Sequence, residues 1–191
     1  MLNLILASQS PQRRIILSTL GIPFSTAPAN IDEQAVKAKS EVERSKKIAL
    51  TKAKKVQSEN PNSVVIAADT YTLVNNRVYE KPASKDEAAQ MLKEQSGQTG
   101  ICLTGFAYLD RTNSIVFNQT AITKLIFRDL SKNEIDKYVS QNPVTTWSAG
   151  FCPAYPEGLA LISQINGSNT GFSHGLPLEM LVGLLRKSKL L

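Results

Sequence analysis

Histidine and cysteine are scarce in this sequence. His174 is the only histidine in 191 residues, which excludes mechanisms that need two imidazoles, including HExxH zinc sites. Cys102 and Cys152 give neither a disulfide framework nor the close pairing of a zinc site. Any metal must therefore be bound through oxygen ligands, and this favours magnesium or manganese.

Long apolar runs are missing as well. The longest early run, Leu4 to Ala7, is too short to span a membrane, and it lacks the basic segment and cleavage site of a secretion signal. We therefore expect a cytoplasmic protein with no membrane partner. Hydrophobic residues make up 42% of the chain and charged residues 20%, which is typical of a folded globular protein, and the length predicts a single domain over residues 1–191.

Positive charge is concentrated in one segment. Lys37 to Lys55 holds eight Lys or Arg and two Glu, so it accounts for the entire net charge of +6. Such a segment can bind nucleic acid, attract phosphate or form the solvated face of a helix. Its pattern is helical and few aromatic residues accompany it, so we favour a solvated face over phosphate attraction, and both over nucleic-acid binding.

Hydrophobic patterning predicts strands that alternate with helices. This is typical of an α/β protein with a mixed, mostly central β-sheet flanked by helices. Serines with N-cap or capping-box spacing open four expected helices, at Ser10, Ser40, Ser84 and Ser131. The expected strands are 3–7, 24–27, 64–68, 101–109, 115–127 and 159–165, and a last helix is expected over 176–185.

A phosphate site is expected after the first strand. Ser8, Ser10, Arg13 and Arg14 place hydroxyls, backbone N–H groups and two guanidiniums at a strand-to-helix turn. Helix N-termini attract anions, and an arginine can bind two phosphate oxygens at once. The competing interpretation is a simple N-cap with exposed arginines.

Carboxylates and a lysine form a second group of candidates. The apolar run 64–68 predicts a buried strand that delivers Asp69 and Thr70 at its C-terminal end, where ligands bind in open α/β sheets. Glu33 follows the second expected strand and is a candidate to converge with Asp69. Lys81 adds a cation after a turn. Each of these residues also has a structural interpretation, as a cap or a surface charge.

Taken in order, these features resemble the Maf family of nucleotide pyrophosphatases over nearly the entire chain. The segments that carry the resemblance are 4–11 (LILASQSP), 31–33 (IDE), 52–53 (KA), 68–70 (ADT), 81–82 (KP), 91–92 (ML), 96–97 (SG), 104–105 (TG), 127–131 (FRDLS), 149–150 (AG) and 175–178 (GLPL). The resemblance implies two lobes around a deep nucleotide cleft, of the Maf or ITPase-like type, and a homodimer.

The resemblance also implies a reaction. A nucleoside triphosphate would be cleaved between its α and β phosphates, with release of a nucleoside monophosphate and pyrophosphate, and magnesium or manganese would be required. Asp69 would activate water, and the cations would offset the triphosphate charge. By motif match, the catalytic residues would be Asp69, Lys81 and Arg13, the substrate-binding residues Ser8, Gln12, Arg14, Lys52, Thr70 and Tyr155, and the metal ligands Glu33 and Asp69.

Base preference is expected to follow from four positions at which the subgroups of the family differ. Gln12, and the lack of a histidine at Gly100, lean toward members that act on 7-methyl-GTP. Thr70 leans toward the dTTP/UTP pyrophosphatases, and Tyr155 fits neither group. We therefore expect a modified or non-standard nucleotide, with the 7-methyl-GTP type favoured over the dTTP/UTP type.

Two other functions compete with this interpretation. Residues 147–158 depart most from the family pattern, so a catalytically impaired regulatory protein that binds nucleotides is the first alternative. A nucleic-acid-binding module that uses Lys37 to Lys55 is the second, and salt-dependent binding would be its minimum requirement.

Overall fold

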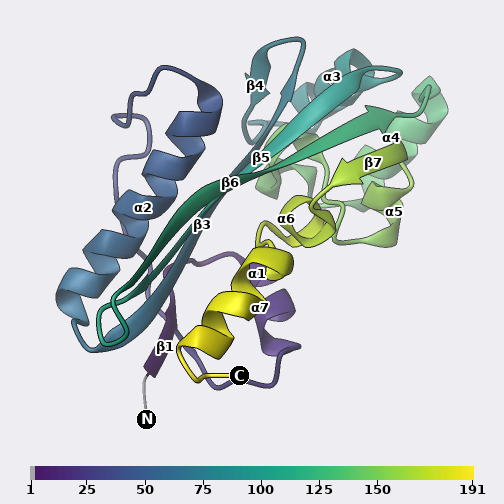
Figure 1. The fold of residues 1–191 in the computed structure, drawn as a ribbon. Coiled ribbons are helices and arrows are strands. Elements are labelled where there is room, and N and C mark those ends of the chain that lie inside the picture. Colours follow the sequence, from purple (N-terminus) through teal and green to yellow (C-terminus); the bar gives the residue numbers. More distant parts are fainter. Residues whose placement is uncertain (1–2) are drawn as a thin grey trace. The chain divides into compact units, whose positions relative to one another are not determined.

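A seven-stranded mixed sheet flanked by helices forms the framework of the protein (Figure 1). The computed structural model describes residues 3–191. The strand order is β2-β1-β3-β5-β6-β7, and β4 pairs with β3. The mixed α/β fold class is therefore confirmed.

The strands are β1 Asn3–Leu6, β2 Ser25–Thr26, β3 Ser63–Val74, β4 Arg77–Tyr79, β5 Thr99–Asp110, β6 Ile115–Phe127 and β7 Ile162–Gly167. The α-helices are α1 Pro11–Ser18, α2 Glu41–Glu59, α3 Lys85–Gln95, α4 Lys132–Gln141, α5 Pro156–Leu159, α6 Asn169–His174 and α7 Leu178–Lys187. Two short 3₁₀ helices span Val144–Thr146 and Ser148–Gly150.

The chain divides into two compact units. The first contains the chain up to Thr70 together with Leu103–Ala121 and Thr170–Leu191, and the second contains Tyr71–Cys102 and Ile122–Asn169. The long strands β3, β5 and β6 each contribute residues to both units. A single domain with a cleft between two lobes stays a prediction.

The four serine N-caps expected from the sequence are confirmed. In each case the side-chain oxygen accepts a hydrogen bond from the backbone N–H three residues later, and this holds for Ser10, Ser40, Ser84 and Ser131. At α4 the capping box is complete, because the Glu134 carboxylate also accepts the Ser131 backbone N–H. These caps replace hydrogen bonds that the first helical turn lacks, so a local signal is enough to place each helix start.

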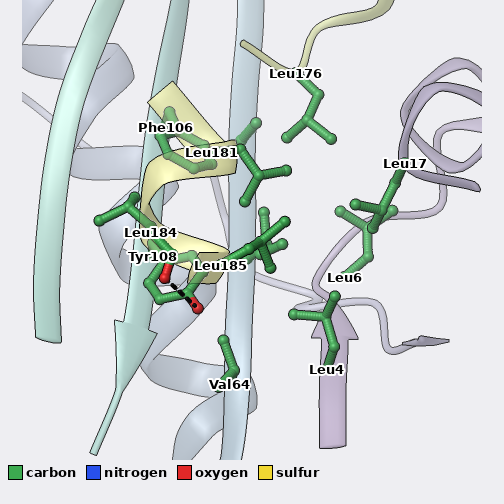
Figure 2. Packing of buried hydrophobic residues seen from close by; sticks show 12 residues of the cluster. Leu4, Leu6, Leu17, Val64, Phe106, Tyr108, Leu176, Leu181, Leu184 and Leu185 are labelled. Atoms are coloured by element: carbon green, nitrogen blue, oxygen red, sulfur yellow. Dashed lines mark hydrogen bonds between the residues drawn. The ribbon is translucent and has the colours of Figure 1, made fainter. Parts of the chain in front are cut away.

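The core of the first unit has two layers, one on each face of β3. Figure 2 shows the layer that contains α7, in which Leu181 and Leu185 pack with Leu17 of α1 and with strand residues. The other layer joins the alanine-rich face of α2 to alternate strand residues. Because side chains alternate along a strand, Ile66 faces the α1 and α7 layer and Ala67 faces α2.

β3 is longer than the sequence predicts. Its expected end near residue 68 was wrong, because the strand continues to Val74, so Asp69 and Thr70 lie in mid-strand. The extension is stabilised by antiparallel pairing with β4 across a turn at Asn75 and Asn76, whose φ angles are both positive. The last register pair between β1 and β3 joins Leu6 to Ile66, so Asp69 and Thr70 lie just beyond the carboxyl end of the parallel neighbour.

Three further expectations differ from the structure. β4, α5 and α6 are elements that the sequence patterns do not predict. The last strand begins at Ile162 rather than at 159, because Leu159 closes α5. The last helix begins at Leu178, because Pro177 is its N-cap.

Candidate active site

Asp69 and Thr70 place functional groups on opposite faces of one strand. Asp69 follows the alternation of Val65 and Ala67 toward α2, and Thr70 follows that of Ile66 toward α1. Asp69 is buried, with 7% of its surface exposed, so its carboxylate needs a partner. The site therefore has a carboxylate part on one face and an arginine part on the other.

Lys52 organises the carboxylate part. Its Nζ lies 2.9 Å from Oδ1 of Asp69 and 2.8 Å from Oε1 of Glu33, so one ammonium contacts both carboxylates. Lys52 comes from the buried stripe of α2 that also contains Ala49, Ala53 and Val56, which aims its side chain at the sheet. The convergence of Glu33 with Asp69 that the sequence suggested is present in the structure.

The loop that carries Glu33 is held from two sides. Asp32 Oδ1 accepts the backbone N–H groups of Gln34 and Ala35, which closes a tight turn around Glu33. Arg44 of α2 donates from Nη2 to the carbonyl of Glu33, at 3.2 Å. Backbone contacts on both sides of Glu33 therefore fix the chain while its carboxylate stays half-exposed, with 48% of the side chain accessible.

Arg13 is the centre of the arginine part. Its Nη1 donates to Ser8 Oγ at 3.1 Å, its Nη2 to Thr70 Oγ1 at 3.1 Å and its Nε to the carbonyl of Gly175 at 2.8 Å. All three of these acceptors are uncharged, and together they hold the guanidinium in one orientation. An arginine fixed in this way is suited to a phosphate ligand.

Ser8 has a hydroxyl proton that its two hydrogen-bond donors do not use. Its Oγ accepts from the backbone N–H of Ser10 at 3.1 Å and from Arg13 at 3.1 Å. A serine hydroxyl has two acceptor positions and one donor, so these two contacts leave the O–H as the group that can donate to a ligand. This arrangement supports the phosphate-binding role that the sequence suggests for Ser8.

Gly175 has to be glycine for two reasons. Its φ of +68° lies in the left-handed region, which side chains disfavour. A Cβ at this position would lie 2.9 Å from Thr70 Oγ1 and 3.1 Å from Arg13 Nε.

His174, the residue before Gly175, is half-buried, and burial lowers the pKa of its imidazole below 6.5. His174 Nδ1 lies 2.7 Å from the Ser173 hydroxyl.

The carboxylate part fits magnesium or manganese in one specific way. Among residues 3–191 there is no group of three or more His, Cys, Asp and Glu side chains that could enclose a metal. Mg²⁺ commonly uses one or two carboxylates together with substrate phosphates and water, and oxygen ligands also suit Mn²⁺. Glu33 and Asp69 supply two carboxylates within reach of a single cation, which matches this mode of binding.

The other predicted site residues are distributed as follows. Gln12 Oε1 accepts from the hydroxyl of Ser10 at 3.3 Å, and Arg14 is exposed on α1. Lys81 is exposed in the second unit, between β4 and α3. Tyr155, also in the second unit, is 41% exposed, and its ring centroid lies 5.5 Å from that of Trp147. The roles predicted for these residues stay predictions.

Three residues that contribute to the arginine part, Thr104, Gly171 and Gly175, were not predicted from the sequence residue by residue. Thr104 of β5 contacts Thr70 and donates to the carbonyl of Gly171, and Gly175 holds Arg13 by its carbonyl. Backbone carbonyls leave no composition signal. The only sequence indication is that 104–105 and 175–178 belong to the segments that resemble the Maf family.

The chain has relatives among known proteins over nearly its whole length. The chain is 36% identical to a dTTP/UTP pyrophosphatase of Symbiobacterium thermophilum, over 97% of this chain and 93% of the relative. It is 34% identical to a nucleoside triphosphate pyrophosphatase of Nitrobacter winogradskyi, over 98% and 95%. It is 30% identical to a 7-methyl-GTP pyrophosphatase of Aliivibrio fischeri, over 98% and 97%.

Two further findings bear on the expectations from the sequence. Within the described residues, no helix combines the length and the apolar character that crossing a membrane requires. The family model for Maf-like proteins matches residues 3–188, which include both parts of the candidate site. The chain therefore belongs to the Maf-like protein family.

Proposed function

We propose that this protein is a nucleoside triphosphate pyrophosphatase that hydrolyses the bond between the α and β phosphates. The products are a nucleoside monophosphate and pyrophosphate. One observation carries the proposal: the Lys52 ammonium contacts the carboxylates of both Glu33 and Asp69. Thr70, the next residue of β3, accepts a hydrogen bond from Arg13. Relatives named as pyrophosphatases of different nucleoside triphosphates support the same reaction.

Arg13 and Ser8 bind phosphate oxygens in this proposal. The guanidinium brings a positive charge held in one orientation, and the Ser8 hydroxyl brings an O–H donor. A triphosphate carries several negative charges, so charge-assisted hydrogen bonds of this kind supply both affinity and orientation. Because both residues flank the start of α1, the helix N-terminus adds attraction for the anion.

Asp69 is the general base. Lys52 contacts its Oδ1, which leaves Oδ2 as the oxygen that we assign to water. The water oxygen bonds to one phosphorus of the α–β linkage while Asp69 takes the water proton. The bond between that phosphorus and the bridging oxygen breaks, and the bridging oxygen leaves with the other phosphate group, so that a nucleoside monophosphate and pyrophosphate separate. The Lys52 contact holds the carboxylate in one orientation, and a positioned base of this type contributes about 10²-fold to 10⁴-fold in rate.

Glu33 and Asp69 would hold the divalent ion. A bound Mg²⁺ or Mn²⁺ would supply charge stabilisation at the phosphate oxygens and acidify coordinated water. Glu33 is suited to this role because its backbone is fixed while its carboxylate is accessible. Lys52 balances the two carboxylates and so limits their mutual repulsion.

A base of the 7-methyl-GTP type is the finer part of the proposal. It is supported by Gln12 and by the absence of histidine at Gly100, together with the relative from Aliivibrio fischeri. The relative from Symbiobacterium thermophilum supports dTTP or UTP instead. The base panel described next distinguishes these two types by the ratio of kcat/KM values.

The test is a panel of triphosphates with one pair of variants. Purified protein is given each canonical nucleoside triphosphate, 7-methyl-GTP and modified pyrimidine triphosphates with Mg²⁺ or Mn²⁺, and pyrophosphate release is measured. Asp69→Asn should reduce kcat by roughly 10²-fold or more, because it removes the proton acceptor. Asp136→Asn, which breaks the exposed pair with Lys132, is the matched control and should leave turnover unchanged. Normal turnover by Asp69→Asn would remove Asp69 from the role of base, and binding without turnover by the unaltered protein would favour the regulatory alternative.

A further inference from the structure

A continuous series of hydrogen bonds runs from Arg13 through the hydroxyl groups of Thr70 and Thr104 to the C-terminal part of the protein. Arg13 Nη2 lies 3.1 Å from Thr70 Oγ1, Thr70 Oγ1 lies 3.1 Å from Thr104 Oγ1, and Thr104 Oγ1 lies 2.8 Å from the carbonyl oxygen of Gly171. Thr104 is 1% exposed, so its hydroxyl depends on protein partners. All of these residues belong to the first unit.

The direction of every hydrogen bond in this series follows from its two ends. The carbonyl of Gly171 can only accept, so the single proton of Thr104 is directed at it. Thr104 must then accept from Thr70, which uses the single proton of Thr70. Arg13 can only donate, so Thr70 meets it with a lone pair. Each group therefore donates to the next one: Arg13 to Thr70, Thr70 to Thr104, and Thr104 to the carbonyl of Gly171.

We propose that Thr104 is a positioning residue for the phosphate-binding Arg13, which it controls by fixing the hydroxyl of Thr70 as an acceptor. Without Thr104, the Thr70 proton can rotate toward Arg13, and a donor would then face a donor. The proposal rests on the phosphate-binding role of Arg13 in the proposed function. It assigns a role to a residue that does not itself contact the substrate.

This inference changes the expected role of Thr70. The resemblance to the Maf family places Thr70 among the positions that are expected to set base preference. Its proton is committed to Thr104 and its lone pair to Arg13, so Thr70 acts on the phosphate side. Loss of Thr104 should therefore weaken the binding of all triphosphates by a similar factor and leave the preference among bases unchanged.

The test compares Thr104→Val, which keeps the shape of the side chain, with Thr104→Ser, which restores the hydroxyl. Thr104→Val should lower kcat/KM by roughly 10-fold to 100-fold for every base accepted, and Thr104→Ser should recover most of the loss. Thr123→Val is the matched control, because Thr123 is also a strand threonine, is 1% exposed and donates to a carbonyl, that of Ser168. It should leave the kinetics unchanged. Thr104→Ala removes the same hydroxyl and replaces Thr104→Val if that variant does not fold.

Coupling to Arg13 separates positioning from a general loss of structure. In an Arg13→Lys background the arginine fork is gone, so Thr104→Val should cost no more than about twofold there. An equal cost in both backgrounds, a shift in base preference, or near-normal kcat/KM in Thr104→Val would overturn the proposal.

Binding of a non-hydrolysable triphosphate, measured by calorimetry in the same variants, distinguishes this failure from failure of the proposed function. If the unaltered protein binds the analogue but releases no pyrophosphate, the reaction assignment fails. Weaker binding by Thr104→Val would in that case still support the positioning role, and equal binding would contradict it. Absence of binding by the unaltered protein would overturn both proposals.

Discussion

Replacement of Gly175 by alanine tests how tightly the arginine part is built. Gly175 has a φ of +68°, and its Cβ would approach Thr70 Oγ1 to 2.9 Å and Arg13 Nε to 3.1 Å. Gly21 provides a matched control, because it has the same φ of +68° but nothing lies within 4 Å of its Cβ. The two substitutions share the left-handed φ, but only the methyl group at Gly175 would meet the site, because Gly21 is exposed and Gly175 is buried.

The magnitudes follow from this difference. Left-handed backbone costs an alanine about 1–2 kcal/mol, so Gly21→Ala should lower Tm by roughly 2–8 °C and leave kcat/KM unchanged. Gly175→Ala should lose more stability, because the new methyl group must displace Thr70 or Arg13. A displaced guanidinium no longer matches the phosphate, so kcat/KM should fall by roughly tenfold or more.

Thermal unfolding followed by circular dichroism, together with steady-state kinetics on both variants, checks this prediction. We expect the left-handed backbone to lower Tm in both variants by a similar amount, with a further loss in Gly175→Ala. Only Gly175→Ala should have a lower kcat/KM. Equal Tm values for the two variants, with normal kinetics in Gly175→Ala, would refute the argument that this glycine spaces Arg13.

Two further predictions concern buried and half-buried titratable groups. Burial raises the pKa of Asp110, but hydrogen bonds from Ser188 and Asn113 outweigh it and leave the pKa below 3.8. Ser188→Ala should therefore cost about 1–3 kcal/mol in urea unfolding at pH 7. The cost should shrink as the pH falls from 3.8 through the lower pKa of folded Asp110, because protonation of Asp110 removes the stabilisation in the unaltered protein too. An equal cost at pH 7 and at the acidic end of this titration would contradict the prediction. Because burial lowers the pKa of His174, the folded state binds its proton less well than the unfolded state, so the free energy of unfolding should fall as pH drops below 6.5. Urea titrations at pH 5.5 and 7.5 should show a smaller pH difference for His174→Gln, and an unchanged difference would assign the effect elsewhere.

Local signals made much of the fold predictable. Each serine cap depends on residues within three positions of it, so Ser84 and Ser131 could be assigned from sequence alone. The buried run before Asp69 was equally clear, because its β-branched and apolar residues are covered on both faces. The end of β3 was not predictable in this way. Its second half depends on pairing with β4, and the polar residues after Ala68 mask the strand pattern.

The candidate site was also predictable only in part. The residue types of Asp69 and Arg13 suggested the roles that we propose for them, and the family resemblance supplied their order along the chain. What the sequence does not contain is the geometry that connects distant segments. The bond from Arg13 to the carbonyl of Gly175 crosses 162 positions, and it involves a backbone atom that every residue possesses. Such contacts become visible only when the fold brings the segments together.

Product identity is the most direct test of the central claim. A triphosphate that the protein turns over is followed by ³¹P NMR in the presence of Mg²⁺, first with the unaltered protein and then with Asp69→Asn. Cleavage between the α and β phosphates predicts equal amounts of nucleoside monophosphate and pyrophosphate from the unaltered protein, formed at least about 10²-fold more slowly by the variant. Formation of a nucleoside diphosphate and orthophosphate as the initial products would contradict the account.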